Sequence, residues 1–209
     1  MQLAILKTLL FGVIKMSKFN GVKTNNAKTT VKADLRNELL CKIEQPKVLE
    51  VFCGAGEMYH QVWHKADKYT GIDKVKYFDK RHTICGDARK ALRLIDDLAE
   101  FNIFDIDAYG SPYEVLDDII KLGDIKKPVA FCITDGIDMD LRLGRVCSGI
   151  RKFIGYEHHI AKRANNLHDQ FIKIVCDKVA EKLNGKITHF EIATGKTGAA
   201  MKYYAFVIE

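Results

Sequence analysis

The chain has 209 residues, with 47% hydrophobic and 29% charged side chains and a formal net charge of +6 at pH 7, which is typical of one globular domain with a single core. It contains no apolar run of about 18 residues or more that could span a bilayer, so we expect a cytoplasmic protein without membrane contact. Its six cysteines form no C-x-x-C pair, which argues against a zinc knuckle or a disulfide framework.

The N-terminal segment, residues 1–31, has an apolar start followed by a basic, aperiodic stretch. Lys7 interrupts the apolar start and no small-residue cleavage site follows it, so the pattern argues against a signal peptide. We expect a flexible arm or short helix here, or sequence that precedes a start at Met16. The folded domain is predicted to span residues 32–209.

From Asp34 onward, segments with helical spacing of apolar residues alternate with apolar runs of strand length. The predicted helices are Asp34–Ile43 and four apolar stripes, at Met58, Val62 and Ala66; Ala91, Ile95 and Leu98; Val115, Ile119 and Leu122; and Leu167, Phe171, Ile174 and Leu183. The predicted strands are Lys47–Phe52, Tyr69–Asp73, Thr83–Cys85, Asn102–Asp107, Val129–Thr134, Ile187–Ala193 and Met201–Ile208. This alternation predicts parallel strands with right-handed crossovers and helices on both faces.

The last two predicted strands are joined by residues 194–200, too few to form a crossover helix. They are therefore predicted to form an antiparallel hairpin. The fold class that follows is α/β, a Rossmann-like, seven-stranded mixed sheet that ends in this hairpin. Five parallel strands followed by a terminal hairpin are typical of class I methyltransferases rather than of dehydrogenases.

A glycine loop follows the first predicted strand, in Glu50-Val51-Phe52-Cys53-Gly54-Ala55-Gly56. Glycines allow a ligand to approach the backbone closely. A dinucleotide fingerprint needs a third glycine where this chain has Tyr59. The loop therefore favours a zwitterionic cofactor, S-adenosylmethionine, over a diphosphate.

Carboxylates end the next predicted strands, at the edge of an open sheet where ligands bind. Asp73 is expected to accept the ribose hydroxyls, Asp87 to receive the adenine amine, and Glu50 to orient the amino end of the cofactor. Any one of these acids alone could be a cap or turn residue, and the prediction rests on their joint occurrence. The predicted cofactor-binding residues are Glu50, Cys53, Gly54, Gly56, Asp73, Lys74, Asp87, Ala88 and Asp105.

The end of the fourth strand, Asp105-Ile106-Asp107-Ala108-Tyr109-Gly110-Ser111-Pro112, resembles the D-x-D-P-[FY]-G-S-P signature of tRNA guanine-N2 dimethyltransferases. Ile133-Thr134-Asp135 is similar to the Thr-Asp after the fifth strand of that family. The resemblance runs from about Lys47 to the C-terminus and is specific at the fourth strand. It implies methyl transfer to the exocyclic amine of a guanine in RNA. The chain departs from the signature at Ala108, where the family has proline, and it stops at Glu209 without the additional RNA-binding domain of such enzymes.

The chemistry of this loop can also be argued from its residues. An exocyclic amine is a poor nucleophile because its lone pair is delocalised into the ring, so an enzyme must hold the amine protons in acceptors. Asp107 and the carbonyl of Ala108 can supply them, and Tyr109 offers a face for a flipped base. We therefore predict Asp107, Ala108 and Tyr109 as the catalytic group. The alternative is that Asp105 and Asp107 only cap the strand and the next helix.

Residues 141–173 carry seven Lys or Arg against two acids. Aromatic residues lie between these cations, at Phe153, Tyr156, His158 and His159, a combination suited to phosphate contact and base stacking. The segment could instead be a solvated surface anchored by its aromatic side chains. The predicted substrate-binding residues are Tyr109, Ser111, Pro112, Asp135, Arg142, Arg145, Arg151 and Lys152.

Two other functions remain open on sequence grounds. The acceptor could be adenine or cytosine in DNA, or a small molecule, because the exocyclic-amine argument covers any such acceptor. The chain could also be an inactive RNA-binding module with a methyltransferase fold, which Ala108 alone favours. His60 and His64 lie one helical turn apart, but Gln61 replaces a general base and no third ligand is evident, so no metal is expected.

Overall fold

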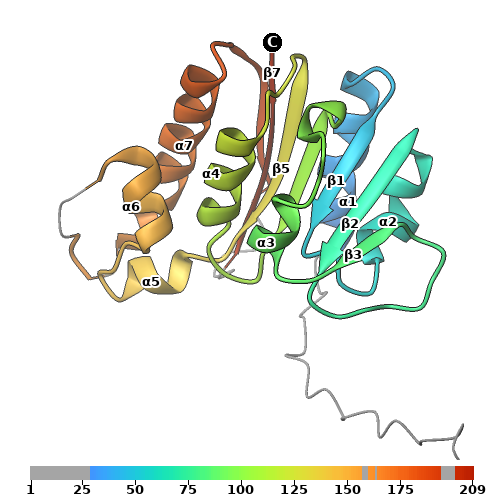
Figure 1. Cartoon of the computed structure of the whole chain (residues 1–209). Coiled ribbons are helices and arrows are strands. Elements are labelled where there is room, and N and C mark those ends of the chain that lie inside the picture. The colour runs from blue at the N-terminus through green and yellow to red at the C-terminus, as the bar shows by residue number, and fades with distance from the viewer. Residues whose placement is uncertain (1–28, 157–159, 163, 194–200) are drawn as a thin grey trace, which may run out of the picture.

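The computed structural model describes residues 29–156, 160–162, 164–193 and 201–209 (Figure 1). A seven-stranded sheet in the order β3-β2-β1-β4-β5-β7-β6 forms its centre. The first five strands run parallel, and β7 is antiparallel to both β5 and β6. The strands are β1 Lys47–Val51, β2 Lys68–Asp73, β3 Thr83–Cys85, β4 Ile103–Asp107, β5 Val129–Asp135, β6 Ile187–Ala193 and β7 Lys202–Ile208.

Seven α-helices and three short 3-10 helices are present in the described part of the chain. The α-helices are α1 Thr29–Lys42, α2 Glu57–Gln61, α3 Ala88–Leu92, α4 Tyr113–Leu122, α5 Asp138–Arg142, α6 Ser148–Ile154 and α7 His168–Lys182. The 3-10 helices are η1 Trp63–Lys65, η2 Leu98–Glu100 and η3 Ala164–Leu167.

The sheet carries one hydrophobic layer on each face (Figure 1). One layer joins α1, α2 and η1 to side chains such as Val48, Ala130 and Ala205. The other joins α3, α4, α6 and α7 to the alternate side chains, such as Leu49 and Phe131. The central strands are buried on both faces, which is why they read as nearly continuous apolar runs in the sequence.

The predicted fold class is confirmed, with every predicted strand found within one residue of its expected bounds. The antiparallel pairing of β6 and β7 is also confirmed, although the connecting residues 194–200 lie outside the described residues. Among the described residues, no helix is both long and apolar enough to cross a membrane.

The helix predictions were less accurate. α1 begins at Thr29 and so includes three residues that were assigned to the N-terminal segment. The stripe at Ala91, Ile95 and Leu98 is not one helix, because α3 ends at Leu92 and η2 starts only at Leu98. The stripe from Met58 likewise divides into α2 and η1. The basic segment begins at the end of α5 and contains α6, neither of which was predicted.

Candidate functional site

The candidate site lies at the carboxyl edge of the parallel strands, at the lower edge of the sheet in Figure 1. The parallel register places Glu50 of β1 beside Asp105 of β4, and Asp107 of β4 beside Thr134 of β5. Side chains alternate between the faces of a strand, so Glu50, Asp105 and Asp107 all point to the face covered by α1. Three carboxylates therefore gather beneath one helix.

The glycine loop after β1 is built from residues with positive φ. Gly54 and Gly56 have φ of +47° and +85°, and Phe52 has φ of +68°, a left-handed conformation that is strained for a bulky side chain. The amides of Phe52 and Cys53 both donate to the carbonyl of Ile72, at 2.8 and 3.1 Å. The loop is thus held against the end of β2.

Arg81, from the connection between β2 and β3, clamps the same loop from the other side. Its side chain is fully buried and donates to the carbonyls of Cys53 and Gly54, at 3.3 and 2.9 Å, and to the carboxylate of Asp79. A Cβ atom at Gly56 would lie 2.5 Å from the Arg81 guanidinium carbon. A side chain at Gly56 would therefore push the Arg81 guanidinium from this position, and Cys53 and Gly56 are both buried.

Glu50 is only 1% exposed. The Tyr69 hydroxyl donates to its carboxylate at 2.5 Å. Burial, with the nearby Asp105 carboxylate adding to it, raises the pKa of Glu50 to about 8. Glu50 is accordingly protonated in a large fraction of molecules at neutral pH.

Asp73 is the last residue of β2, and Asp87 directly precedes α3. The carboxylate of Asp73 accepts from the amides of Gly54 and Val75, at 2.9 and 2.8 Å, and so joins the glycine loop to β2. Asp87 pairs with Lys74 at 3.3 Å, and both side chains are well exposed. A hydrogen bond from Lys74, with its positive charge, lowers the pKa of Asp87. The adjoining Ala88 is buried at the first position of α3.

Asp107 is held by two donors. The Lys32 ammonium lies 2.6 and 2.9 Å from its two carboxylate oxygens, and the Thr134 hydroxyl donates to one of them at 2.6 Å. Burial opposes ionisation of Asp107, but the charges of Arg36 and Lys32 and these hydrogen bonds outweigh it and lower the pKa. Asp107 is an ionised acceptor, and 19% of its side chain is exposed.

The loop after β4 packs backbone to backbone on the loop after β5. The amide of Gly136 donates to the carbonyl of Gly110 at 3.0 Å, and a Cβ at Gly136 would lie 2.6 Å from the Tyr109 carbonyl oxygen. Tyr109 is 68% exposed, whereas the Ala108 side chain is buried. The structure thus brings the predicted catalytic residues together and leaves the Tyr109 ring accessible.

Asp105 does not reach the surface of the site. Both of its oxygens accept from the Arg36 guanidinium at 2.7 Å, and one also accepts from the Trp63 indole at 2.7 Å. Asp105 and Arg36 are 0% exposed. The sequence prediction that Asp105 contacts the cofactor directly has no geometric support, because its carboxylate is occupied by these buried donors.

Asp135 is buried in the same way on the other face of the sheet. Its carboxylate accepts from the Tyr113 hydroxyl and from the amide of Ile137, and His168 Nε2 lies 3.0 Å from it. Pro112, at the start of α4, is also buried. The predicted direct contact of Asp135 with substrate is not supported either, since its carboxylate instead anchors the loop after β5.

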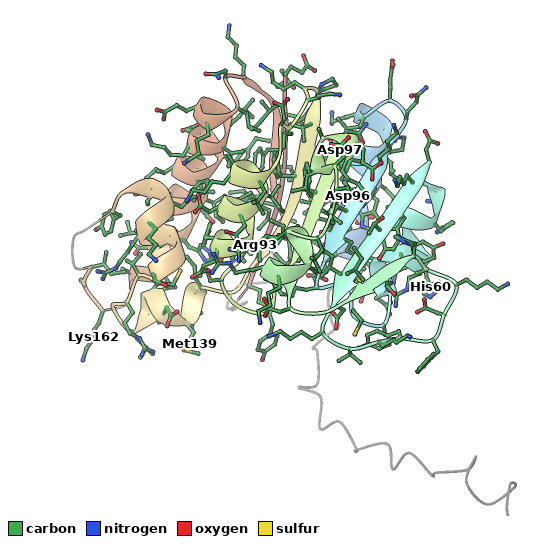
Figure 2. All side chains as sticks on the ribbon, in the orientation of Figure 1. His60, Arg93, Asp96, Asp97, Met139 and Lys162 are labelled. Carbon is green, nitrogen blue, oxygen red and sulfur yellow. The ribbon has the colours of Figure 1, made fainter. Side chains whose placement is uncertain are left out.

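The basic segment lies beside the carboxyl end of β5, with α5 and α6 at the lower left of Figure 1 and Met139 and Lys162 labelled there in Figure 2, and α6 packs against α4 and α7. Arg142 and Arg145 pair with Asp138 and Asp140, at 2.6 and 3.5 Å, so part of their charge is neutralised. Arg151 donates to the Val146 carbonyl, and Lys152 is exposed. His158, His159 and Arg163 lie outside the described residues.

Ser111 connects the loop after β4 to α6. Its hydroxyl donates to Glu114 at 3.0 Å and accepts from the Cys147 thiol at 3.4 Å. Burial raises the pKa of this thiol, so Cys147 is a poor nucleophile. All six cysteines are free.

Space for a ligand exists along this edge. A Cβ atom built on Gly54, Gly86 or Gly110 would meet nothing within 4 Å, and these glycines lie at the ends of β1, β3 and β4. The residues present therefore fit a ligand laid across the strand ends, beside the carboxylates of Asp73 and Asp87.

One group of metal-ligand side chains was found among the described residues. Glu38, His189 and Glu191 place ligand atoms within 4.8 Å of one another between α1 and β6. Lys42 lies 3.5 Å from Glu38, and His189 lies 3.2 Å from it. These partners form an ion-pair network away from the strand ends.

Sequence reasoning missed Lys32, Arg36, Tyr69 and Arg81. The first two had a signal, since Lys32 and Arg36 precede Leu39 and Ile43 on one helical stripe that is otherwise apolar. A cation on a buried stripe indicates a buried carboxylate partner. Tyr69 and Arg81 had no local signal.

No protein-family model matches the chain, and no curated protein matches it significantly. Similarity emerges only when solved structures are compared.

Three of these structures illustrate the likeness. Trm1 from Pyrococcus horikoshii, solved with S-adenosyl-L-methionine, superposes with a TM-score of 0.56 at 13% identity, over 87% of this chain and 54% of that one. A SAM-dependent methyltransferase from Archaeoglobus fulgidus gives 0.51 at 13% identity, over 86% and 93%. The plantazolicin methyltransferase BpumL, solved with SAH and a desmethylPZN analogue, gives 0.51 at 12% identity, over 89% and 86%.

The chain spans about half the length of Trm1 (54%) but most of the other two proteins. At these identities the likeness concerns the fold. The strand order, the terminal hairpin and the superpositions agree on one conclusion: the chain has the fold of the class I S-adenosylmethionine-dependent methyltransferases.

Proposed function

We propose that the protein is an S-adenosylmethionine-dependent N-methyltransferase that acts on an exocyclic amine of a nucleobase in RNA, with guanine in tRNA as the favoured target. The observation that carries this proposal is the loop after β4. It holds an ionised, partly exposed Asp107 and an exposed Tyr109 beside the glycine loop.

The cofactor would lie across the ends of β1, β2 and β3. Gly54 lies open to it, and Asp73 keeps unused lone pairs for ribose hydroxyls after accepting two backbone amides. Asp87 and Lys74 would contact the adenine end. The cofactor supplies an electrophilic methyl group on a sulfonium centre.

One carboxyl group beneath α1 has no cationic partner among the described residues. The face beneath α1 contains three carboxylates, Glu50, Asp105 and Asp107, and among the described residues two cations of α1, Lys32 and Arg36, contact them. Glu50 is the carboxylate left over, with its pKa raised to about 8. The ammonium of a zwitterionic cofactor would compensate the ionised form of Glu50.

The acceptor amine would be held by the loop after β4. Asp107 and the Ala108 carbonyl would accept its two protons and so free the nitrogen lone pair. The exposed ring of Tyr109 would stack on the base. Asp105 and Asp135 would act only as buried supports of the two loops.

RNA is favoured over DNA or a small molecule on two grounds. The loop resembles the signature of tRNA guanine-N2 dimethyltransferases, and the basic α5–α6 segment touches that loop through Cys147 and Ser111. An inactive RNA-binding module remains the alternative from another class, and it predicts no transfer.

The decisive experiment is transfer of a labelled methyl group from S-adenosylmethionine to total RNA, DNA and a small-molecule extract, using the full chain. We expect label in RNA. Asp107→Ala and Asp107→Asn should lower the rate by about 10²–10⁴-fold, the range for loss of acid–base assistance, while calorimetry shows unchanged cofactor affinity.

Asp96→Asn is the matched control. Asp96 is exposed and lies between α3 and η2, apart from the labelled Met139 and Lys162 (Figure 2), so this variant should keep full activity. Label absent from RNA would reject the proposed acceptor. Equal loss of activity and cofactor affinity in the Asp107 variants would instead make Asp107 a cofactor ligand.

A further inference from the structure

Lys32 is paired with Asp107, the carboxylate that the proposed reaction needs as a proton acceptor. Its ammonium contacts both oxygens of Asp107, at 2.6 and 2.9 Å, and lies 5.4 Å from the centre of the Tyr203 ring. Thr134 adds a third hydrogen bond to the same carboxylate. Asp107 is therefore paired with a cation at the position where an amine would have to donate.

An ammonium at this position opposes methylation of an amine. As the amine nitrogen forms its bond to the methyl carbon, the carbon–sulfur electron pair goes to sulfur and the nitrogen becomes positive until its proton passes to Asp107. A neighbouring positive charge raises the energy of that step. Lys32 must therefore leave Asp107 before transfer.

The fold allows Lys32 to leave without moving α1. Arg36 lies one helical turn later on the same face and is fully buried in its pair with Asp105. Lys32 lies in the first turns of α1 and is 18% exposed. Rotation of its side chain toward solvent is sufficient.

A displaced ammonium needs another anion to offset the lost pair with Asp107. A phosphate group of the acceptor can supply it, because lysine binds phosphate as a point charge. An acceptor without phosphate leaves Lys32 unpaired or still bound to Asp107.

We propose that Lys32 is a cap on Asp107 that a phosphate-bearing acceptor displaces, which makes methyl transfer depend on a nucleotide within a polyanion rather than on a free nucleoside. This inference rests on the proposed function. It assigns to α1 a specificity-determining residue in the active site.

The test compares transfer to a pool of unmodified tRNA transcripts with transfer to a mixture of the four ribonucleosides, for the wild type, Lys32→Met and Lys42→Met. In Lys32→Met, the preference for transcripts in kcat/KM should shrink by about tenfold or more, the size of one charge-assisted hydrogen bond. The slope of log KM for the transcripts against log salt should become shallower by about one.

Lys42→Met is the control, because Lys42 lies at the other end of α1 and pairs with Glu38. It should retain the wild-type preference. Thermal unfolding and SAH binding establish that each variant is folded, and Lys32→Gln replaces Lys32→Met if the latter does not fold.

Each remaining outcome has one meaning. Unchanged preference and salt slope in Lys32→Met would overturn the cap and leave the proposed function intact. An equal fall in kcat/KM for the transcripts and for the ribonucleosides, with SAH binding retained, would also overturn the cap, because Lys32 would then serve the transfer itself. No transfer by the wild type to either acceptor would reject the proposed function and the cap with it.

Discussion

Glu50 is a buried acid whose ionisation lowers the stability of the folded chain. Its carboxyl is 1% exposed, and burial raises its pKa from an ordinary value of 4.5 to about 8. A pKa that is higher in the folded state contributes stability fully below pH 4.5, and this contribution is lost as the pH rises toward 8. Ionised Glu50 therefore destabilises the folded protein at alkaline pH.

Glu50→Gln should remove this pH dependence. The amide keeps a partner for the Tyr69 hydroxyl but cannot ionise. We expect the free energy of unfolding of the variant to exceed that of the wild type by a few kcal/mol at pH 8, with the difference vanishing near pH 4.5. Urea unfolding across this range measures it.

Glu44→Gln is the control, since Glu44 is exposed in the turn before β1. Parallel stability curves for wild type and Glu50→Gln would contradict the raised pKa. Glu50→Gln should also bind S-adenosylmethionine more weakly than the wild type if Glu50 contacts the ammonium of the cofactor.

At the scale of the element, α1 is attached to the sheet by charge as well as by apolar packing. Arg36 forms a bidentate pair with Asp105, and Trp63 of η1 donates to the same carboxylate. Both members of the pair are 0% exposed. Loss of one partner would leave a buried charge without compensation.

Arg36→Met should destabilise the protein by about 3–5 kcal/mol, the usual cost of breaking a buried pair. The double variant Arg36→Met with Asp105→Leu should recover most of this loss, because apolar groups of similar volume can replace both charges. Chemical denaturation of the single and double variants measures the difference. A double variant no more stable than Arg36→Met would show that volume, rather than charge, dominates at this position.

At the scale of the whole molecule, the open strand ends predict a response to ligand. A ligand that binds only the folded state at 100 times its Kd adds about 2.7 kcal/mol, which for a chain of this size corresponds to roughly 5–10 °C in the melting temperature. SAH should produce such a shift in thermal unfolding, and NAD should not. A shift with NAD alone would favour a dinucleotide site.

The sequence by itself determined the seven strands and their parallel and antiparallel senses, and it predicted the edge of the sheet at which the candidate site lies. These features follow from local periodicity and from the rule that short connections make hairpins and long ones make crossovers. The glycine loop and the acids Asp73, Asp87 and Asp107 were identified for the same reason, since strand ends can be read directly from the sequence.

Only the tertiary structure decided which of the acids are free to act. Asp105 and Asp107 are two residues apart and look equivalent in the sequence, yet Arg36 and Trp63 enclose Asp105, while Asp107 remains partly exposed beneath Lys32. These partners lie 42 to 75 residues away in the chain. Local pattern can mark Lys32 and Arg36 as cations on an apolar stripe, but it does not say which acid each one contacts, because these contacts arise only when α1 and η1 pack on the sheet.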